Sequence, residues 1–107
     1  MTRLRDLDGD LVQIIENGNI ARESATANAV FFECPCGDGH VNLIAFEPTI
    51  GGATPARSGL SRKGGTWRRE SGETVDDLTL SPSIAVRSRP DGSECWHGFI
   101  RNGEVTP

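Results

Sequence analysis

The chain has 107 residues, a formal net charge of −4, 36% hydrophobic residues and 13 glycines. At this length we expect a single domain, residues 1–107, whose modest core would gain much stability from a bound metal. The acidic balance argues against a nucleic-acid-binding protein, since such proteins are usually basic. No apolar run approaches the roughly 20 residues of a membrane span, so we expect no membrane association.

Short apolar stretches separated by Gly, Pro and Asn predict strands along the whole chain. We expect strands over residues 11–15, 30–33, 41–46, 66–69, 74–80, 84–87, 95–100 and 104–106. Residues 21–29 fit a short helix or a loop equally well, and residues 47–65, with two prolines and five glycines, predict a long surface loop. Asn102-Gly103 predicts a hairpin turn. Without sustained helical periodicity, the sequence predicts a mostly β fold, a small antiparallel sheet or hairpin domain.

Every cysteine and both histidines lie in two short segments, residues 34–40 and residues 95–98. Three cysteines cannot all pair as disulfides. The N-terminus also lacks the apolar core of a signal peptide, so we expect a cytosolic protein whose thiols stay reduced. In a reducing compartment, a bound metal explains this clustering better than disulfides do.

Zinc in a structural site takes four nitrogen or sulfur ligands in a tetrahedron. Cys34 and Cys36 form one close pair, and Cys95 and His97 form a second, so two distant hairpins would clamp one ion. Because residues i and i+2 of a strand share a face, each pair can converge on the ion. The sequence therefore predicts a zinc site made by these four residues, with Asp38 or His40 as the alternative fourth ligand.

Three motifs resemble a family of small phage and bacterial proteins long described as a domain of unknown function. They are the Cys-x-Cys-Gly-x-Gly of residues 34–39, the Leu-Ser-Pro-Ser-Ile of residues 80–84, and the Cys-x-His segment that runs to Arg-x-Gly over residues 95–103. Asp38 stands where the family often has a further cysteine. Some relatives resemble peptidases of bacterial ubiquitin-like conjugation operons. The resemblance implies a bacterial host cytosol, a phage or prophage origin for some members, and a protein substrate that is ubiquitin-like.

A serine peptidase needs a nucleophilic hydroxyl, a base within hydrogen-bonding distance, and donors for the oxyanion. Ser83 is the first candidate nucleophile, because Pro82 could hold its turn rigid, and Ser81 is the second. His97 is the candidate base. His97 cannot both ligate zinc and act as a free base, so a catalytic His97 would leave the fourth zinc position to Asp38, His40 or water.

Further hypotheses remain open at this stage. The Ser81–Ser83 segment is equally consistent with a plain turn between strands. Asp76, Asp77 or Glu33 could orient His97. An open zinc site with Glu33 as base would give a water-activating hydrolase, but three thiolates make the metal a poor Lewis acid. The chain could instead be a non-catalytic, zinc-stabilised accessory module that binds a host or partner protein. Trp67, Trp96 and Phe99 are the candidate anchors, although each of the three fits the core better.

Overall fold

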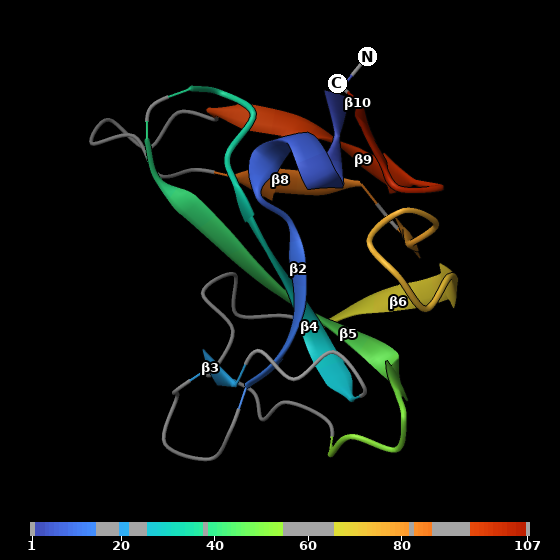
Figure 1. Cartoon of the computed structure of the whole chain (residues 1–107). Coiled ribbons are helices and arrows are strands. Elements are labelled where there is room, and N and C mark those ends of the chain that lie inside the picture. The colour runs from blue at the N-terminus through green and yellow to red at the C-terminus, as the bar shows by residue number, and fades with distance from the viewer. Residues whose placement is uncertain are drawn as a thin grey trace.

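The structure is a computed structural model, which describes residues 2–14, 20–21, 26–37, 39–54, 66–81, 83–86 and 95–106. Two β-sheets and one short 3-10 helix, η1 (Leu4–Leu7), make up this part of the chain (Figure 1). The smaller sheet has the order β1-β10-β9-β8, with β1 (Thr2–Arg3), β8 (Ile84–Val86), β9 (Trp96–Arg101) and β10 (Glu104–Thr106). The larger sheet has the order β3-β2-β4-β5-β6-β7, with β2 (Asp10–Ile14), β3 (Ile20–Ala21), β4 (Ala27–Glu33), β5 (Val41–Ile50), β6 (Thr66–Ser71) and β7 (Thr79–Ser81).

Most neighbouring strands are antiparallel, as the sequence predicts, while β5 and β6 run parallel. Parallel strands cannot be joined by a tight turn, so β5 and β6 do not form a hairpin. β7 lies at one edge of the six-stranded sheet, and β8 lies at one edge of the four-stranded sheet. These two edge strands follow one another in sequence.

The main core is formed by apolar side chains from both sheets and from η1. Phe32 and Phe46 of the six-stranded sheet and Ile84 and Ile100 of the four-stranded sheet are fully buried in the same cluster. Phe32 meets Trp96 edge to face, with ring centroids 6.0 Å apart. Because side chains alternate along a strand, β4 and β5 also supply a second, smaller apolar cluster on the opposite face of their sheet.

The β9–β10 hairpin is fixed by its two-residue turn. Asn102 and Gly103 both have positive φ, 50° and 76°, as a type I′ turn requires. The turn is tied to the start of β7, because Asn102 N–H donates to Thr79 Oγ1 at 2.8 Å and Gly103 N–H donates to the Leu78 carbonyl at 2.9 Å. These bonds hold β9 in place relative to the chain that leads into β7 and β8.

The predicted strands are largely confirmed, with two differences, and the structure adds β1, β3 and η1, which the sequence did not predict. Residues 74–77 form a turn in place of the first half of the predicted strand, because the Asp77 carboxylate accepts hydrogen bonds from both the N–H and the hydroxyl of Thr74. The predicted loop over 47–65 is wrong at its start, since β5 continues to Ile50, which pairs with Ala27. The ambiguous segment 21–29 ends in β4. Ile15, Pro82 and residues 22–25, 55–65 and 87–94 lie outside the described part of the chain. The described part contains no helix long and apolar enough to cross a membrane.

Candidate functional site

The first cysteine pair lies at the tip of the β4–β5 hairpin. The register that pairs Glu33 with Val41 brings Cys34 opposite His40, and the Cys34 N–H donates to the His40 carbonyl at 3.0 Å. A second bond, from the Gly37 N–H to the Cys34 carbonyl at 3.3 Å, closes a tight turn around Cys36. The short loop therefore brings its first and last residues side by side and places the donor atoms of Cys34, Cys36 and His40 close together.

Cys95 reaches this hairpin from the other sheet. It occupies a bend one residue before β9, and its Sγ lies 3.7 Å from Cys34 Sγ and 3.3 Å from His40 Nε2. His40 Nε2 is also 3.8 Å from Cys36 Sγ. The four donor atoms of Cys34, Cys36, His40 and Cys95 all lie within 4.8 Å of one another, and no disulfide links the cysteines. The four residues lie close together and could bind a metal ion.

Three separations within this Cys3His cluster fit the edges of a tetrahedral metal site. With metal–sulfur bonds of about 2.3 Å and metal–nitrogen bonds of about 2.05 Å, a regular tetrahedron has S···S edges of about 3.8 Å and S···N edges of about 3.6 Å. The S···S separation of 3.7 Å and the S···N separations of 3.3 and 3.8 Å match these edges. A bound ion would have four protein ligands and no open position, which is the donor set of a structural site.

The fourth member of the cluster is His40, the alternative named from the sequence, and not His97, the first choice. The reason is the start of β9. The predicted strand includes Cys95, which would put Cys95 and His97 on one face, but the observed strand begins at Trp96. Cys95 turns at the bend toward the β4–β5 hairpin, whereas His97 follows the strand and lies on its exposed face. Asp38, the other alternative, lies outside the described residues.

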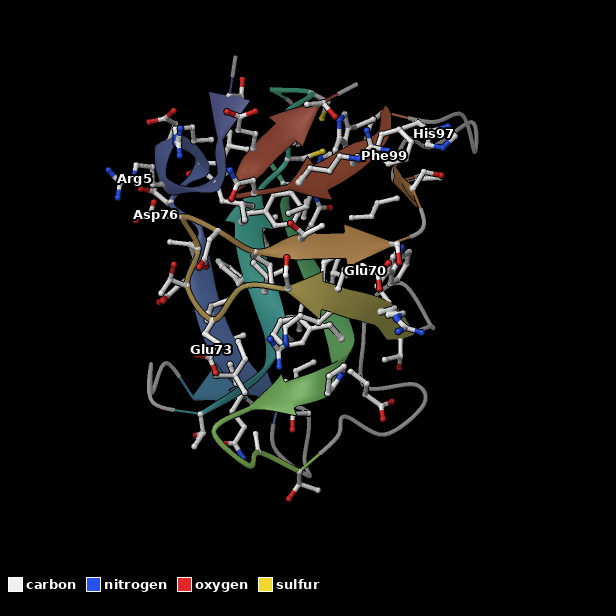
Figure 2. All side chains as sticks on the ribbon, turned by 90° about the vertical axis from the view of Figure 1, so that its right-hand side faces the viewer. Arg5, Glu70, Glu73, Asp76, His97 and Phe99 are labelled. Carbon is white, nitrogen blue, oxygen red and sulfur yellow. The ribbon has the colours of Figure 1, made fainter. Side chains whose placement is uncertain are left out.

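His97 instead contacts Ser83, the candidate nucleophile. His97 Nε2 lies 3.1 Å from Ser83 Oγ, a hydrogen-bonding distance. The contact follows from the ladder between β8 and β9, which pairs Ile84 with Gly98 and Ala85 with His97. Ser83 immediately precedes β8, where the chain passes from the edge of one sheet to the edge of the other. Figure 2 shows His97 at the upper right edge of the molecule.

The backbone of Ser83 is held by Trp67, a residue that sequence reasoning treated as core or as a surface anchor. The Trp67 indole Nε1–H donates to the Ser83 carbonyl at 3.2 Å across the gap between β6 and the start of β8. Trp67 packs against the main core, so the indole is itself fixed. The sequence shows that Trp67 carries an N–H donor, but it does not identify the acceptor, which is 16 residues away.

Two of the three carboxylates proposed to orient His97 have other contacts, and the third is exposed. Asp76 pairs with the Arg5 guanidinium, and this ion pair raises the pKa of Arg5. Asp77 caps Thr74, and the hydrogen bond from the Thr74 hydroxyl lowers the pKa of Asp77. Glu33 is exposed at the end of β4. Among these described residues, none forms a hydrogen bond or an ion pair with His97.

The two constellations share strand β9 but remain separate. Cys95, just before the strand, belongs to the Cys3His cluster, and His97, two residues later, belongs to the Ser83 pair. A bound ion would therefore tie the beginning of β9 to the β4–β5 hairpin and fix the strand that carries His97. The arrangement combines a Cys3His cluster that could bind a metal ion with a serine–histidine pair of the kind that supports acyl transfer.

This combination defines the class of protein: a small two-sheet domain with a Cys3His cluster beside a Ser–His pair. Residues 8–107 match the model of the family described as bacterial ubiquitination-like system serine protease (BubE), so the chain belongs to that family. No curated protein and no solved structure matches the chain.

Proposed function

We propose that this protein is a serine peptidase that cleaves a protein substrate, with Ser83 as nucleophile and His97 as general base. The observation that carries the proposal is the 3.1 Å contact between Ser83 Oγ and His97 Nε2. A hydroxyl is a weak nucleophile until a neighbouring base accepts its proton, and this contact supplies the base at the required distance. The family description of a serine protease in a ubiquitination-like system supports the same assignment and makes a ubiquitin-like protein the proposed substrate class.

The reaction follows from the pair. Ser83 Oγ attacks the scissile carbonyl carbon while His97 Nε2 takes the hydroxyl proton, which gives a tetrahedral oxyanion and an imidazolium. His97 then donates the proton to the leaving nitrogen, the C–N bond breaks, and the acyl group remains as an ester on Ser83. A water molecule attacks this ester as His97 accepts its proton, and return of that proton to Ser83 Oγ releases the acid product.

We assign zinc to the cluster of Cys34, Cys36, His40 and Cys95, because three thiolates and one imidazole form one of the usual structural zinc sets. When bound, the ion supplies mechanical stability and no substrate chemistry, since four protein ligands leave it no open position. This closed set speaks against the water-activating hydrolase in which Glu33 would act as base. Thiolate ligands also suit a reducing compartment, which supports a cytosolic location.

Labelling with a fluorophosphonate tests the proposal, because this reagent phosphonylates only serines that a base activates. We expect one adduct per chain, located at Ser83 by peptide mass spectrometry, and loss of labelling in both Ser83→Ala and His97→Ala. Ser71→Ala, at the exposed end of β6, serves as the matched control. Loss of labelling in Ser81→Ala with retention in Ser83→Ala would move the nucleophile to the other serine.

The competing hypothesis is a non-catalytic, zinc-stabilised module that binds a host or partner protein. It accounts for the Cys3His cluster but gives no role to the contact between Ser83 and His97. The same labelling experiment separates the two hypotheses. A folded, zinc-loaded protein that no fluorophosphonate labels would leave the binding module as the better explanation.

A further inference from the structure

The outer face of β9 continues beyond the Ser83–His97 pair. Burial alternates along the strand: Trp96, Gly98 and Ile100 are buried, whereas His97 and Arg101 are exposed and Phe99 is partly exposed. Because alternate residues share a face, His97, Phe99 and Arg101 form one outward row. Figure 2 shows His97 and Phe99 as neighbours along this strand.

Phe99 lies beside the nucleophile. The β8–β9 ladder pairs Ile84 with Gly98, and continuing that register by one residue places Ser83 opposite Phe99. Directly opposed residues of an antiparallel pair are only about 5 Å apart and project to the same side. The partly exposed ring of Phe99 therefore flanks the point where the scissile carbonyl must lie.

Arg101 places a positive charge on that ring. Its Cζ lies 4.0 Å from the centroid of the Phe99 ring, which is a cation–π stacking distance. A guanidinium that stacks on a ring uses its flat face, so its N–H groups stay available to an acceptor. Since the ring limits its rotamers, the guanidinium is partly preorganised for a planar acceptor such as a carboxylate.

Among the described residues, the carboxylate nearest to Arg101 along the ladder is paired with another arginine. Glu104 is directly across the ladder from Arg101, yet its carboxylate pairs with Arg3 at 3.9 Å. Within the residues that the structure describes, no carboxylate forms an ion pair with Arg101. In a chain with a net charge of −4, this is a fixed positive group beside the nucleophile.

We propose that Phe99 and Arg101 form a subsite that binds a carboxylate of the substrate close to the scissile bond. The occupant is an extended segment of a protein substrate that carries either an Asp or Glu side chain or its own C-terminal carboxylate. Two residues of extended chain span roughly 7 Å, so the carboxylate lies within about two or three residues of the cut. This inference rests on the proposed peptidase function and adds a substrate preference to it.

The test uses peptides from a bacterial proteome digested with chymotrypsin, in which both acidic and basic side chains occur at internal positions. The zinc-loaded protein is incubated with this mixture, and the new termini are identified by mass spectrometry. We expect Asp and Glu to be enriched at one fixed position near the cut if a side chain is recognised. Cuts at a fixed distance from the peptide C-terminus would identify the terminal carboxylate as the group recognised.

Variants of Arg101 separate recognition from folding. In Arg101→Gln the preference should fall by about fivefold to tenfold, the size expected for one partly exposed charge-assisted contact. In Arg101→Glu the preference should turn toward Lys and Arg, a gain that a misfolded protein cannot produce. Arg5→Gln removes the same charge from η1, where Arg5 pairs with Asp76 and not with a neighbour of Arg101, and should keep the wild-type profile.

The outcomes distinguish this inference from the proposed function. A protein that is labelled at Ser83 but shows no carboxylate-dependent cleavage overturns the subsite and leaves the peptidase proposal intact. An unchanged profile in Arg101→Gln overturns it in the same way. A protein whose Ser83 is not labelled and which cuts no peptide fails the proposed function, and the subsite fails with it.

Discussion

Stability should depend on free zinc because the Cys3His cluster joins the two sheets. Cys34, Cys36 and His40 belong to the hairpin of the six-stranded sheet, while Cys95 begins β9 of the four-stranded sheet. Cys34 and Cys95 are 61 residues apart in the sequence. Unfolding therefore moves the ligands apart, and the complete ligand set exists only in the folded state. A ligand that binds only the folded state stabilises it by RT ln(1 + [L]/Kd).

The magnitude follows from this relation. Above the dissociation constant, each tenfold rise in free zinc adds about 1.4 kcal/mol to the free energy of unfolding for one ion per chain. For a domain of about 100 residues, 1 kcal/mol shifts the melting temperature by about 4–8 °C, so each decade of zinc should raise it by roughly 6–11 °C. A second ion with similar affinity would double this slope.

The assay is a thermal melt followed by circular dichroism in metal buffers that set free zinc over four decades, with elemental analysis of the loaded protein. Two histidine variants make the assignment specific. His40→Ala should lose the bound zinc and the zinc dependence of the melt, whereas His97→Ala should keep one zinc per chain and the wild-type slope. A melting temperature that is independent of zinc would refute the structural role of the cluster. Loss of zinc in His97→Ala with retention in His40→Ala would refute the ligand assignment.

Three further predictions concern single contacts. Trp67→Phe keeps an aromatic ring in the core but removes the donor to the Ser83 carbonyl, so it should slow fluorophosphonate labelling while lowering the free energy of unfolding by only about 0.5–1.5 kcal/mol. NMR titration should place the pKa of Asp77 below 3.8, and Thr74→Val should raise it toward that value; because the folded pKa is lowered, this contact stabilises the fold above about pH 4 and is lost as the pH falls further. Gly98→Ala would place a Cβ 1.7 Å from a carbonyl oxygen of β10, so it should lower the melting temperature and reduce labelling together.

Local sequence patterns predicted most of the strands and the three cysteines of the metal cluster. Strands β2, β4, β5, β6, β8, β9 and β10 follow from short apolar stretches and their turn residues, and Asn102-Gly103 forms the expected hairpin turn. The three cysteines could be grouped because cysteines so clustered in a reducing environment need a common explanation. The Ser83–His97 pair was suggested by the family resemblance, and its contact appears in the structure.

The identity of the histidine in the metal cluster could not be predicted, because it depends on where one strand begins. Extending β9 by a single residue would place Cys95 and His97 on one face and direct both to the ion. The register of the β4–β5 hairpin favours His40 instead, because Cys34 and His40 lie opposite each other at the two ends of its loop. The contact between Trp67 and Ser83 was also beyond sequence reasoning, because it joins two elements through the parallel β5–β6 pair, which no local pattern specifies.

The proximity of the two constellations has a physical reason. The β8–β9 ladder that brings Ser83 to His97 has only three residue pairs, and a ladder of that length at the edge of a sheet is weakly held. Catalysis requires the nucleophile and base to stay within hydrogen-bonding distance, so the beginning of β9 must not fray. A metal bound through Cys95, two residues before His97, would supply the restraint where the ladder is weakest. Removal of zinc at a temperature where the apo protein stays folded should therefore slow the labelling of Ser83, although no ligand of the ion contacts that hydroxyl.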